Sequence, residues 1–550
     1  MSDLMKGRAS SSSEFVQDKK YEVYLGKKEK KNMVCPTSQL VQEEKHEYSL
    51  GKRGRFDEEE HLGRKLRNKS EYKLGDRHGP KNEKLNLGKI EKNNGENSLV
   101  DRISGTPDEI LVSILSLLPL KDAGATSALS RRWQCVWMST MTLNFDVNFH
   151  LHRNRLRFRH SRTKLQHLES CRYVNWVDHV AEQHRGAIKQ FKACFGLDGQ
   201  FTSSIDKWIQ FAMKKGVEIL ELDFFLNRGV AAENLYMFPS KPLGLGKEHL
   251  YPYTPNLHSC GYDIGFKFLK VLHFRSVDVT DDVLEYFLSN YPGLERLAVH
   301  RTKSLVNVRV GGSSVALKYL VVEHCLHLKS IEICDANLVS FIYKGQEINL
   351  VLSNVPFLVE VSISADPTSI DLPFTQLSCC LPQLETLMLD ICEVYYNQKR
   401  AFPISENLKH LELIVEADHR WALHHLTYFL KAFPCLQRLA VKLDYSDPEG
   451  GMGKVKKASA CPHHCLKVVE IVGYRGRESA VKHVLYLIKS LVALEKIIID
   501  PVQRFEYPVE RYPSGIDRGV EVVDEEEEVR DHAMQYLKRK VPSSIEFVCL

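Results

Sequence analysis

A few short runs of this 550-residue sequence contain residue types that could do chemistry. Cys461-Pro-His-His-Cys465 places four potential zinc ligands within five residues, but no CxxC pair elsewhere could complete a structural site. Gly450-Gly-Met-Gly-Lys454 and Gly244-Leu-Gly-Lys247 are similar to phosphate-binding loops, yet neither lysine is followed by Ser or Thr. We interpret both glycine runs as turns and expect no metal at the cysteines.

The remaining candidates for chemistry are weaker. The 23 histidines show no HExxH pattern or other metal-ligand spacing. We expect Cys379-Cys380 to be a buried pair of thiols. Because no catalytic constellation rises above chance, the sequence predicts a protein that is not an enzyme and that needs no cofactor.

Composition limits the class of protein. Hydrophobic residues make up 43% and charged residues 26%, which is typical of globular proteins. No apolar run approaches the roughly 18 to 20 residues that span a bilayer, and no secretory signal is visible. We therefore expect no membrane partner, a location in the nucleus, the cytoplasm or both, and free buried thiols among the 14 cysteines.

The excess positive charge lies entirely in the first hundred residues. Residues 1–100 carry 22 Lys and Arg against 17 Asp and Glu, a net of +5, and the other 450 residues are neutral. This segment is rich in Lys, Glu, Asn, Gly and Ser, so we predict that it is disordered. Its first basic cluster, Lys27–Lys31, is interrupted by a glutamate, and its second, Arg64–Arg67, is short. We therefore do not expect nucleic acid as a partner.

Residues 101–146 are predicted to form a small unit of three helices. Thr106, Pro107 and Glu109 have the spacing of a capping box with proline at the first helical position. A second helix is expected at about 121–129, and Ser130 should cap a third that ends near residue 139. The apolar side chains outnumber what so small a core can bury, so a partner or the rest of the chain must cover the surplus.

From about residue 215 an apolar-x-x-apolar-x-apolar pattern recurs many times. From Leu269 onward its copies are spaced by about 20 to 30 residues, the period of leucine-rich repeats. Each copy alternates like a strand with one buried face, and neighbouring copies must stack to bury it. The eleven copies begin at Val217, Leu269, Leu294, Leu317, Leu338, Leu358, Leu384, Leu408, Leu436, Leu466 and Leu494.

Other elements are expected around these repeats. Helices are predicted at 281–289 and 421–433, and a degenerate repeat or a loop near Leu257. The acidic run 524–528 is predicted to be a solvated loop, followed by a short helix at about 529–540 and a last strand within 541–550. The fold class is thus α/β, a leucine-rich-repeat solenoid preceded by a three-helix unit and a disordered segment.

Several of these motifs carry a resemblance to a known family. Asp101-Arg-Ile-Ser, Pro107-Asp-Glu-Ile-Leu, Leu117-Leu-Pro-Leu-Lys-Asp-Ala and Thr126-Ser-Ala-Leu-Ser-Arg-Arg-Trp resemble the F-box of plant F-box proteins, and the repeats resemble those that follow such F-boxes. The region from Cys461 resembles the FBD domain found at the end of many of them. The domains expected are a disordered segment (1–100), an F-box (101–146), leucine-rich repeats (147–458) and an FBD domain that caps them (459–550).

The resemblance implies a substrate receptor of an SCF (Skp–cullin–F-box) ubiquitin ligase. The F-box would dock on a Skp-family adaptor, and through it a cullin, while the repeats and the FBD region hold an unknown substrate protein. An alternative is a scaffold or nuclear binding protein whose F-box is vestigial. The candidate adaptor-binding residues are Pro107, Ile110, Leu111, Ile114, Leu115, Leu118, Leu129, Trp133 and Trp137.

Overall fold

The computed structural model describes residues 103, 105–146, 162–224, 234–240, 265–312, 316–365, 376–391, 403–419, 422–445, 455–458, 461–501 and 520–550. All of these described residues lie in one compact unit, Leu99–Leu550. The predictions made for residues 1–100, for the two glycine runs and for the segment near Leu257 lie outside the described residues.

The chain begins its described part with the expected small helices. They are α3 (Asp108–Leu115), α4 (Leu120–Ala125), the 3₁₀ turn η1 (Thr126–Ala128) and α5 (Arg131–Trp137). The predicted cap of α5 is confirmed, because Ser130 Oγ accepts a hydrogen bond from Trp133 N–H at 3.3 Å. The predicted capping box at Thr106 is wrong. Pro107 is still extended (φ −56°, ψ 148°) and is itself the N-cap, so α3 begins one residue too late for Thr106 to cap it.

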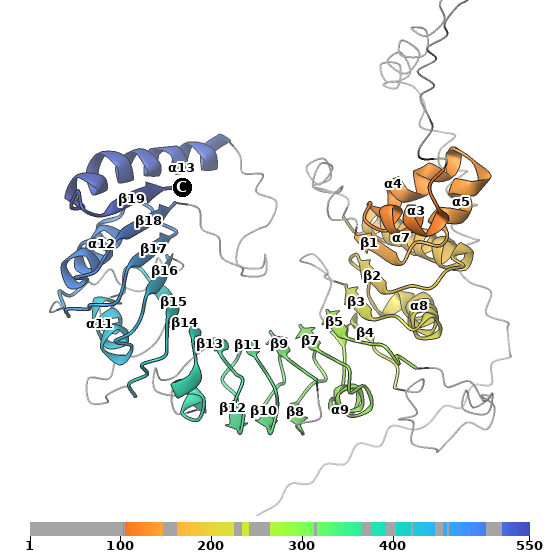
Figure 1. Cartoon of the computed structure of the whole chain (residues 1–550), viewed down its shortest axis with the longest axis horizontal. Coiled ribbons are helices and arrows are strands. Elements are labelled where there is room, and N and C mark those ends of the chain that lie inside the picture. The colour runs from red at the N-terminus through yellow and green to blue at the C-terminus, as the bar shows by residue number, and fades with distance from the viewer. Residues whose placement is uncertain are drawn as a thin grey trace, which may run out of the picture. The chain divides into compact units, whose positions relative to one another are not determined.

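A parallel sheet of 14 strands runs through the rest of this unit, in the order β1-β2-β3-β5-β7-β9-β11-β13-β14-β15-β16-β17-β18-β19 (Figure 1). The strands are β1 (Thr142–Asp146), β2 (Gln190–Cys194), β3 (Ile219–Asp223), β5 (Val271–Arg275), β7 (Arg296–His300), β9 (Tyr319–Glu323), β11 (Ser340–Gly345), β13 (Glu360–Ala365), β14 (Thr386–Asp390), β15 (His410–Glu416), β16 (Arg438–Asp444), β17 (Val468–Val472), β18 (Lys496–Asp500) and β19 (Glu546–Cys549). All eleven predicted repeat strands are confirmed, as is the last strand, β19. The repeat pattern, which was recognised only from about residue 215, missed β1 and β2, and the sheet begins at residue 142.

Helices and short sheets connect the strands. They are α7 (Arg162–Gln183), η3 (Gly199–Phe201), α8 (Thr202–Lys215), α9 (Asp281–Asn290), η7 (Leu381–Gln383), α11 (Ala422–Ala432), α12 (Glu478–Ser490), α13 (Val520–His532), the π-helical η8 (Ala533–Leu537) and η9 (Lys538–Lys540). The predicted helices at 281–289 and 421–433 are confirmed as α9 and α11. A second parallel sheet has the order β12-β10-β8, from β8 (Asn307–Gly311), β10 (Ser330–Cys334) and β12 (Asn349–Ser353), and a third pairs β4 (Tyr236–Met237) with β6 (Val277–Asp278).

One C-terminal prediction is wrong. The acidic run 524–528 lies inside α13, which begins at Val520, and is not a loop. Glutamate is a good helix former, acidic residues are favoured in the N-terminal part of a helix, and Glu526 pairs with Arg530 one turn later at 3.9 Å. Across the described part of the chain, none of the helices is long and apolar enough to cross a membrane.

One hydrophobic core extends from Leu111 in α3 to Leu537 in η8. Side chains at the second and fourth positions of the repeat strands point into this core, as Leu220 and Leu222 do in β3. Because a parallel ladder keeps equivalent positions in register, each stacked repeat buries the apolar face of its neighbour. The small helical unit shares this core, so it covers the first end of the solenoid.

Left-handed residues end several strands. Ser276, Arg301 and His324, which follow β5, β7 and β9, have φ between 54° and 58°. Each N–H still donates to the next strand, to the carbonyls of His300, Glu323 and Lys344 respectively. The chain can therefore leave the sheet sharply without losing the last ladder bond.

Candidate functional site

The helical unit exposes an apolar surface, which we call the F-helix patch and define as Ile110, Ile114, Leu117, Leu118 and Leu129. Their exposed fractions are 52%, 50%, 86%, 43% and 69%. The first four recur at the spacing of one helical face, on α3 and the turn that follows it. So many large apolar side chains on so small a unit are typical of an interaction surface.

The opposite face of the same helices is core. Leu111 and Leu115 are only 2% exposed, and Trp137 is 9% exposed. They belong to the core cluster that also contains Val136 and Leu143 of β1. The prediction that these three residues contact a partner is therefore corrected: they are already enclosed by their own chain. Of the other candidates, Pro107 is exposed and Trp133 is half-buried against the core.

The sequence prediction omitted Leu117, the most exposed residue of the patch. It lies seven residues after Ile110 and three after Ile114, so the helical period of the patch could have identified it. The predicted set, from Ile110 to Leu118, contains residues of both the exposed and the buried face of the helix.

Polar contacts hold the patch in place. Arg132 Nε donates to Asp108 Oδ1 at 2.8 Å, and its Nη2 donates to the carbonyl of Thr106, so α5 is tied to the start of α3. Ser116 Oγ donates to Val112 O at 2.7 Å and accepts from Met141 N–H at 3.0 Å. The bonds of Arg132 fix the start of α3, and those of Ser116 fix its end. The bond from Met141 N–H also joins α3 to the residue that precedes β1.

The helical unit is also tied to the second repeat. Arg185 N–H donates to Met138 O at 3.1 Å, and Lys189 N–H to Met141 O at 2.8 Å. At Gly186 a Cβ atom would lie 2.9 Å from Ser139 Cα, so only glycine allows this close approach. The unit that bears the patch is thus continuous with the solenoid.

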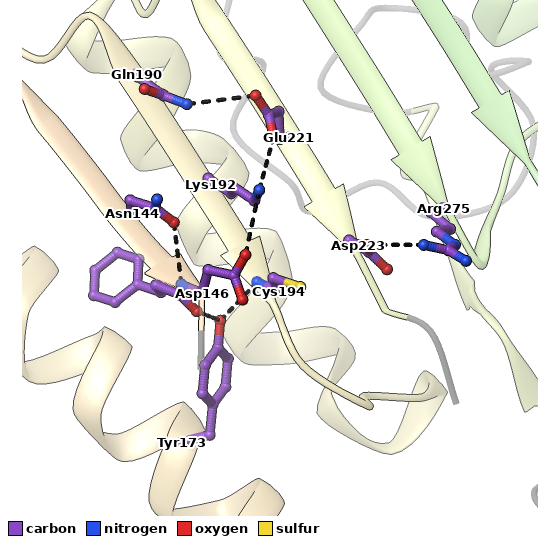
Figure 2. A network of polar contacts seen from close by, with 10 residues as sticks. Asn144, Asp146, Tyr173, Gln190, Lys192, Cys194, Glu221, Asp223 and Arg275 are labelled. Atoms are coloured by element: carbon purple, nitrogen blue, oxygen red, sulfur yellow. Dashed lines mark hydrogen bonds and ion pairs between the residues drawn. The ribbon is translucent and has the colours of Figure 1, made fainter. Parts of the chain in front are cut away.

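A polar network crosses the outward face of the first strands (Figure 2). Lys192 of β2 lies 3.4 Å from Asp146 of β1 and 3.4 Å from Glu221 of β3, and Arg275 of β5 lies 3.5 Å from Asp223. Burial alone would lower the pKa of Lys192, but the two carboxylates outweigh it and raise that pKa. The network continues a few strands further along the sheet.

Glu323 of β9 is the centre of that continuation. It accepts contacts from His300 Nδ1 at 3.1 Å and from Lys344 Nζ at 3.4 Å. Burial favours the protonated carboxyl, yet His300 and Lys344 dominate and lower its pKa to about 2. The ring of the neighbouring His273 is tilted against that of His300, with 4.9 Å between the ring centres. Burial is the main cause that lowers the pKa of His273 to about 3, so it is neutral. This face of the sheet therefore offers charged and hydrogen-bonding groups at fixed positions.

The buried Tyr173 of α7 joins the first two strands. Its hydroxyl donates to Phe145 O at 2.9 Å and accepts from Cys194 N–H at 2.9 Å (Figure 2). The register of β1 and β2 pairs Asp146 with Cys194 at the same place, so the hydroxyl reinforces the end of this strand pair. Burial raises the pKa of Tyr173, so the hydroxyl remains neutral and able to donate.

The residues proposed for other chemistry have structural roles. His463 is buried; its Nε2 lies 2.9 Å from Phe433 O, and its Nδ1 accepts from Leu466 N–H at 3.1 Å. The ring therefore joins two turns and has no nitrogen left for a metal. Within the described ranges no group of three or more His, Cys, Asp or Glu could hold a metal ion.

The cysteines differ in part from the prediction. The eleven cysteines of the described segments are free thiols, but only Cys194, Cys325 and Cys380 are buried. Cys379 is exposed, so the expectation of a buried Cys379-Cys380 pair is wrong. Adjacent residues point in different directions, and Cys379 lies at the surface, where its thiol contacts Leu352 O at 3.1 Å.

Comparison with known families agrees with this architecture. The F-box domain family model matches residues 107–143, and that of the At1g61320/AtMIF1 LRR domain matches residues 180–550. Three relatives come from Arabidopsis thaliana. F-box/FBD/LRR-repeat protein At5g22700 is 26% identical (72% of this chain, 92% of the relative), F-box/FBD/LRR-repeat protein At4g26340 is 27% identical (73% and 93%), and F-box/LRR-repeat protein At2g42720 is 26% identical (75% and 96%).

The FBD domain is named in two of these relatives, and the segment predicted to form it here, 459–550, lies inside the LRR match. The LRR match alone covers more than half of the chain, and the F-box match coincides with the helices that carry the F-helix patch. The chain therefore belongs to the F-box/LRR-repeat family of proteins.

Proposed function

We propose that this protein is the substrate-recognition subunit of an SCF-type ubiquitin ligase, and that the F-helix patch docks a Skp-family adaptor. The observation that carries the proposal is the exposure of five large apolar side chains on a unit whose other face is enclosed by the solenoid. An F-box match over these helices supports an adaptor as the partner. Through the adaptor the protein would reach a cullin.

The repeats would hold the substrate on the outward face of the long sheet. Charged groups there, such as Lys192, Glu323 and Lys344, are fixed by ion pairs and backbone register. A receptor of this kind needs no active site, because holding a substrate near a ubiquitin-loaded enzyme raises its effective concentration. We propose that the protein acts in the nucleus, the cytoplasm or both.

Adaptor docking is tested with aspartate substitutions in the patch. Leu117→Asp should weaken adaptor binding by at least about a hundredfold, because a charge would be buried without a partner. Ile114→Asp and Leu118→Asp should do the same. Leu117 is 86% exposed, so its substitution should leave the thermal melt unchanged and separate docking from folding.

Phe357→Asp provides the matched control. Phe357 is a 57% exposed aromatic residue on the solenoid, outside the F-box, so this variant should bind the adaptor like wild type. The measurement is calorimetry with full chains and a purified Skp-family adaptor. Wild-type affinity in both Leu117→Asp and Ile114→Asp would contradict the proposed docking surface.

Ligase function needs a separate measurement. Proteins captured by the full chain after degradation is blocked should include the adaptor, a cullin and candidate substrates. Leu117→Asp should lose the adaptor and the cullin but keep the substrates, because these bind at a different surface. A capture in which the adaptor is absent from the wild type would favour the scaffold alternative.

A further inference from the structure

Two cysteines occupy the same position in neighbouring repeats. Cys435 and Cys465 each come directly before the first leucine of a repeat, and each lies three residues before a strand, β16 or β17. These two strands are neighbours in the long sheet (Figure 1), and their register pairs Arg438 with Val468. Three residues back from this pair, the equivalent positions of the two repeats are both cysteine.

The segments that carry the two cysteines contact each other on both sides of them. Two residues after the cysteines, Lys467 N–H donates to Gln437 O at 2.9 Å. Two residues before them, His463 Nε2 lies 2.9 Å from Phe433 O. The segments therefore run side by side, at about the 5 Å spacing of neighbouring strands. A disulfide joins Cα atoms that are about 4.4 to 6.8 Å apart, so this backbone separation suits one.

Side chains at this position of the repeat reach back toward the preceding repeat. Gln383 and Asn407 take the position in two other repeats, and their amide groups donate to Val355 O and Pro382 O, each in the turn of the repeat before. The same geometry directs the side chain of Cys465 toward the turn that carries the other cysteine.

Both thiols are accessible. Cys435 is exposed and Cys465 is half-buried, and no hydrogen bond holds either sulfur within the described part of the chain. A third cysteine lies nearby, Cys461, but the equivalent position of the preceding repeat is Lys431, at the end of α11. Cys461 therefore has no thiol at the matching position of the neighbouring repeat.

We propose that Cys435 and Cys465 are a reversible oxidation site, at which a small disulfide such as oxidised glutathione drives formation of a disulfide between the two repeats. The Cys435 thiolate attacks one sulfur of the small disulfide and releases a small thiol. The Cys465 thiolate then attacks the Cys435 sulfur and releases the second small thiol. Two protein thiols are thus oxidised, and one small disulfide is reduced to two thiols that take up the two protons.

Such a link would be a switch rather than a permanent brace. Disulfides in the nucleus or the cytoplasm, where we propose that the protein acts, are usually transient and redox-sensing. This one would join the repeat of β16 to that of β17, which lies in the segment 459–550 that was predicted to form the FBD domain.

The test exposes the reduced full chain to glutathione disulfide, blocks the remaining thiols and maps linked peptides by mass spectrometry. The wild type should give a peptide pair joined through Cys435 and Cys465, which dithiothreitol should separate. Cys435→Ser should instead carry a glutathione adduct on Cys465, because no second thiol can displace the glutathione. Cys461→Ser is the matched control and should form the link like the wild type.

The fold holds the second thiol at an effective concentration that we expect to exceed that of free glutathione. At the same ratio of oxidised to reduced glutathione, the linked fraction of the wild type should be at least about tenfold larger than the adduct fraction of Cys435→Ser. Wild-type melting temperatures check that the variants are folded. A folded wild type that carries only glutathione adducts, that links through Cys461 instead, or whose linked fraction does not exceed the adduct fraction, would overturn the proposal.

Discussion

Removing the Tyr173 hydroxyl should loosen the junction between the first two strands of the solenoid. In Tyr173→Phe the ring keeps its packing, but Phe145 O and Cys194 N–H lose the group that bridges them at 2.9 Å on each side. Both groups lie in buried residues, so water does not readily replace the hydroxyl. The defect is confined to the end of one strand pair.

The size of the effect follows from the two hydrogen bonds that the hydroxyl makes. A typical hydrogen bond contributes about 0.5 to 1.5 kcal/mol net, so the two contribute about 1 to 3 kcal/mol. At 1.4 kcal/mol per tenfold change, the Cys194 amide should exchange roughly 5 to 150 times faster.

The assay is native-state hydrogen exchange of peptides from β1 and β2, with β17 and β18 as an internal reference that should not change. Tyr286→Phe is the control, because the Tyr286 hydroxyl makes no hydrogen bond within the described part of the chain. If the Cys194 amide in Tyr173→Phe exchanges within threefold of wild type, the hydroxyl does not hold the two strands and the reasoning is refuted.

Four further outcomes are expected. Leu111→Ala should destabilise the F-box by about 2 to 4 kcal/mol and abolish adaptor binding because the F-box unfolds. Leu117→Asp should abolish binding without unfolding, and thermal melts of the two variants distinguish these causes. Gly124→Ala should stabilise α4 by up to about 1 kcal/mol, because a Cβ there meets nothing within 4 Å; a lower melting temperature would contradict this. Burial alone would raise the pKa of Asp278, but hydrogen bonds from Ser304 and its neighbours lower it, so its contribution to stability is present above about pH 4 and lost as pH falls through the folded pKa. Asp278→Ala should therefore flatten the acid limb of the stability curve, and an unchanged limb would argue against this role. Deletion of residues 1–98, which precede the compact unit Leu99–Leu550, should leave the melting temperature of the remainder within a few degrees of that of the full chain.

The local sequence was sufficient to predict the repeat strands and the presence of helices in the F-box. A strand with one buried face needs only alternating apolar residues. The same strand pattern then recurs every 20 to 30 residues, once in each repeat. The pattern failed at β1, where the polar Thr140 takes the first apolar position, and at β2, where the small Ala193 takes the last one. It also failed at the start of α3, where the extended backbone of Pro107 displaced Thr106 from the cap position.

The two faces of α3 could not be separated by apolar content alone. Ile110 and Leu111 are neighbours of similar hydrophobicity, yet one is 52% exposed and the other 2%. Only the position of β1 and α5 against the helix decides which of them is enclosed.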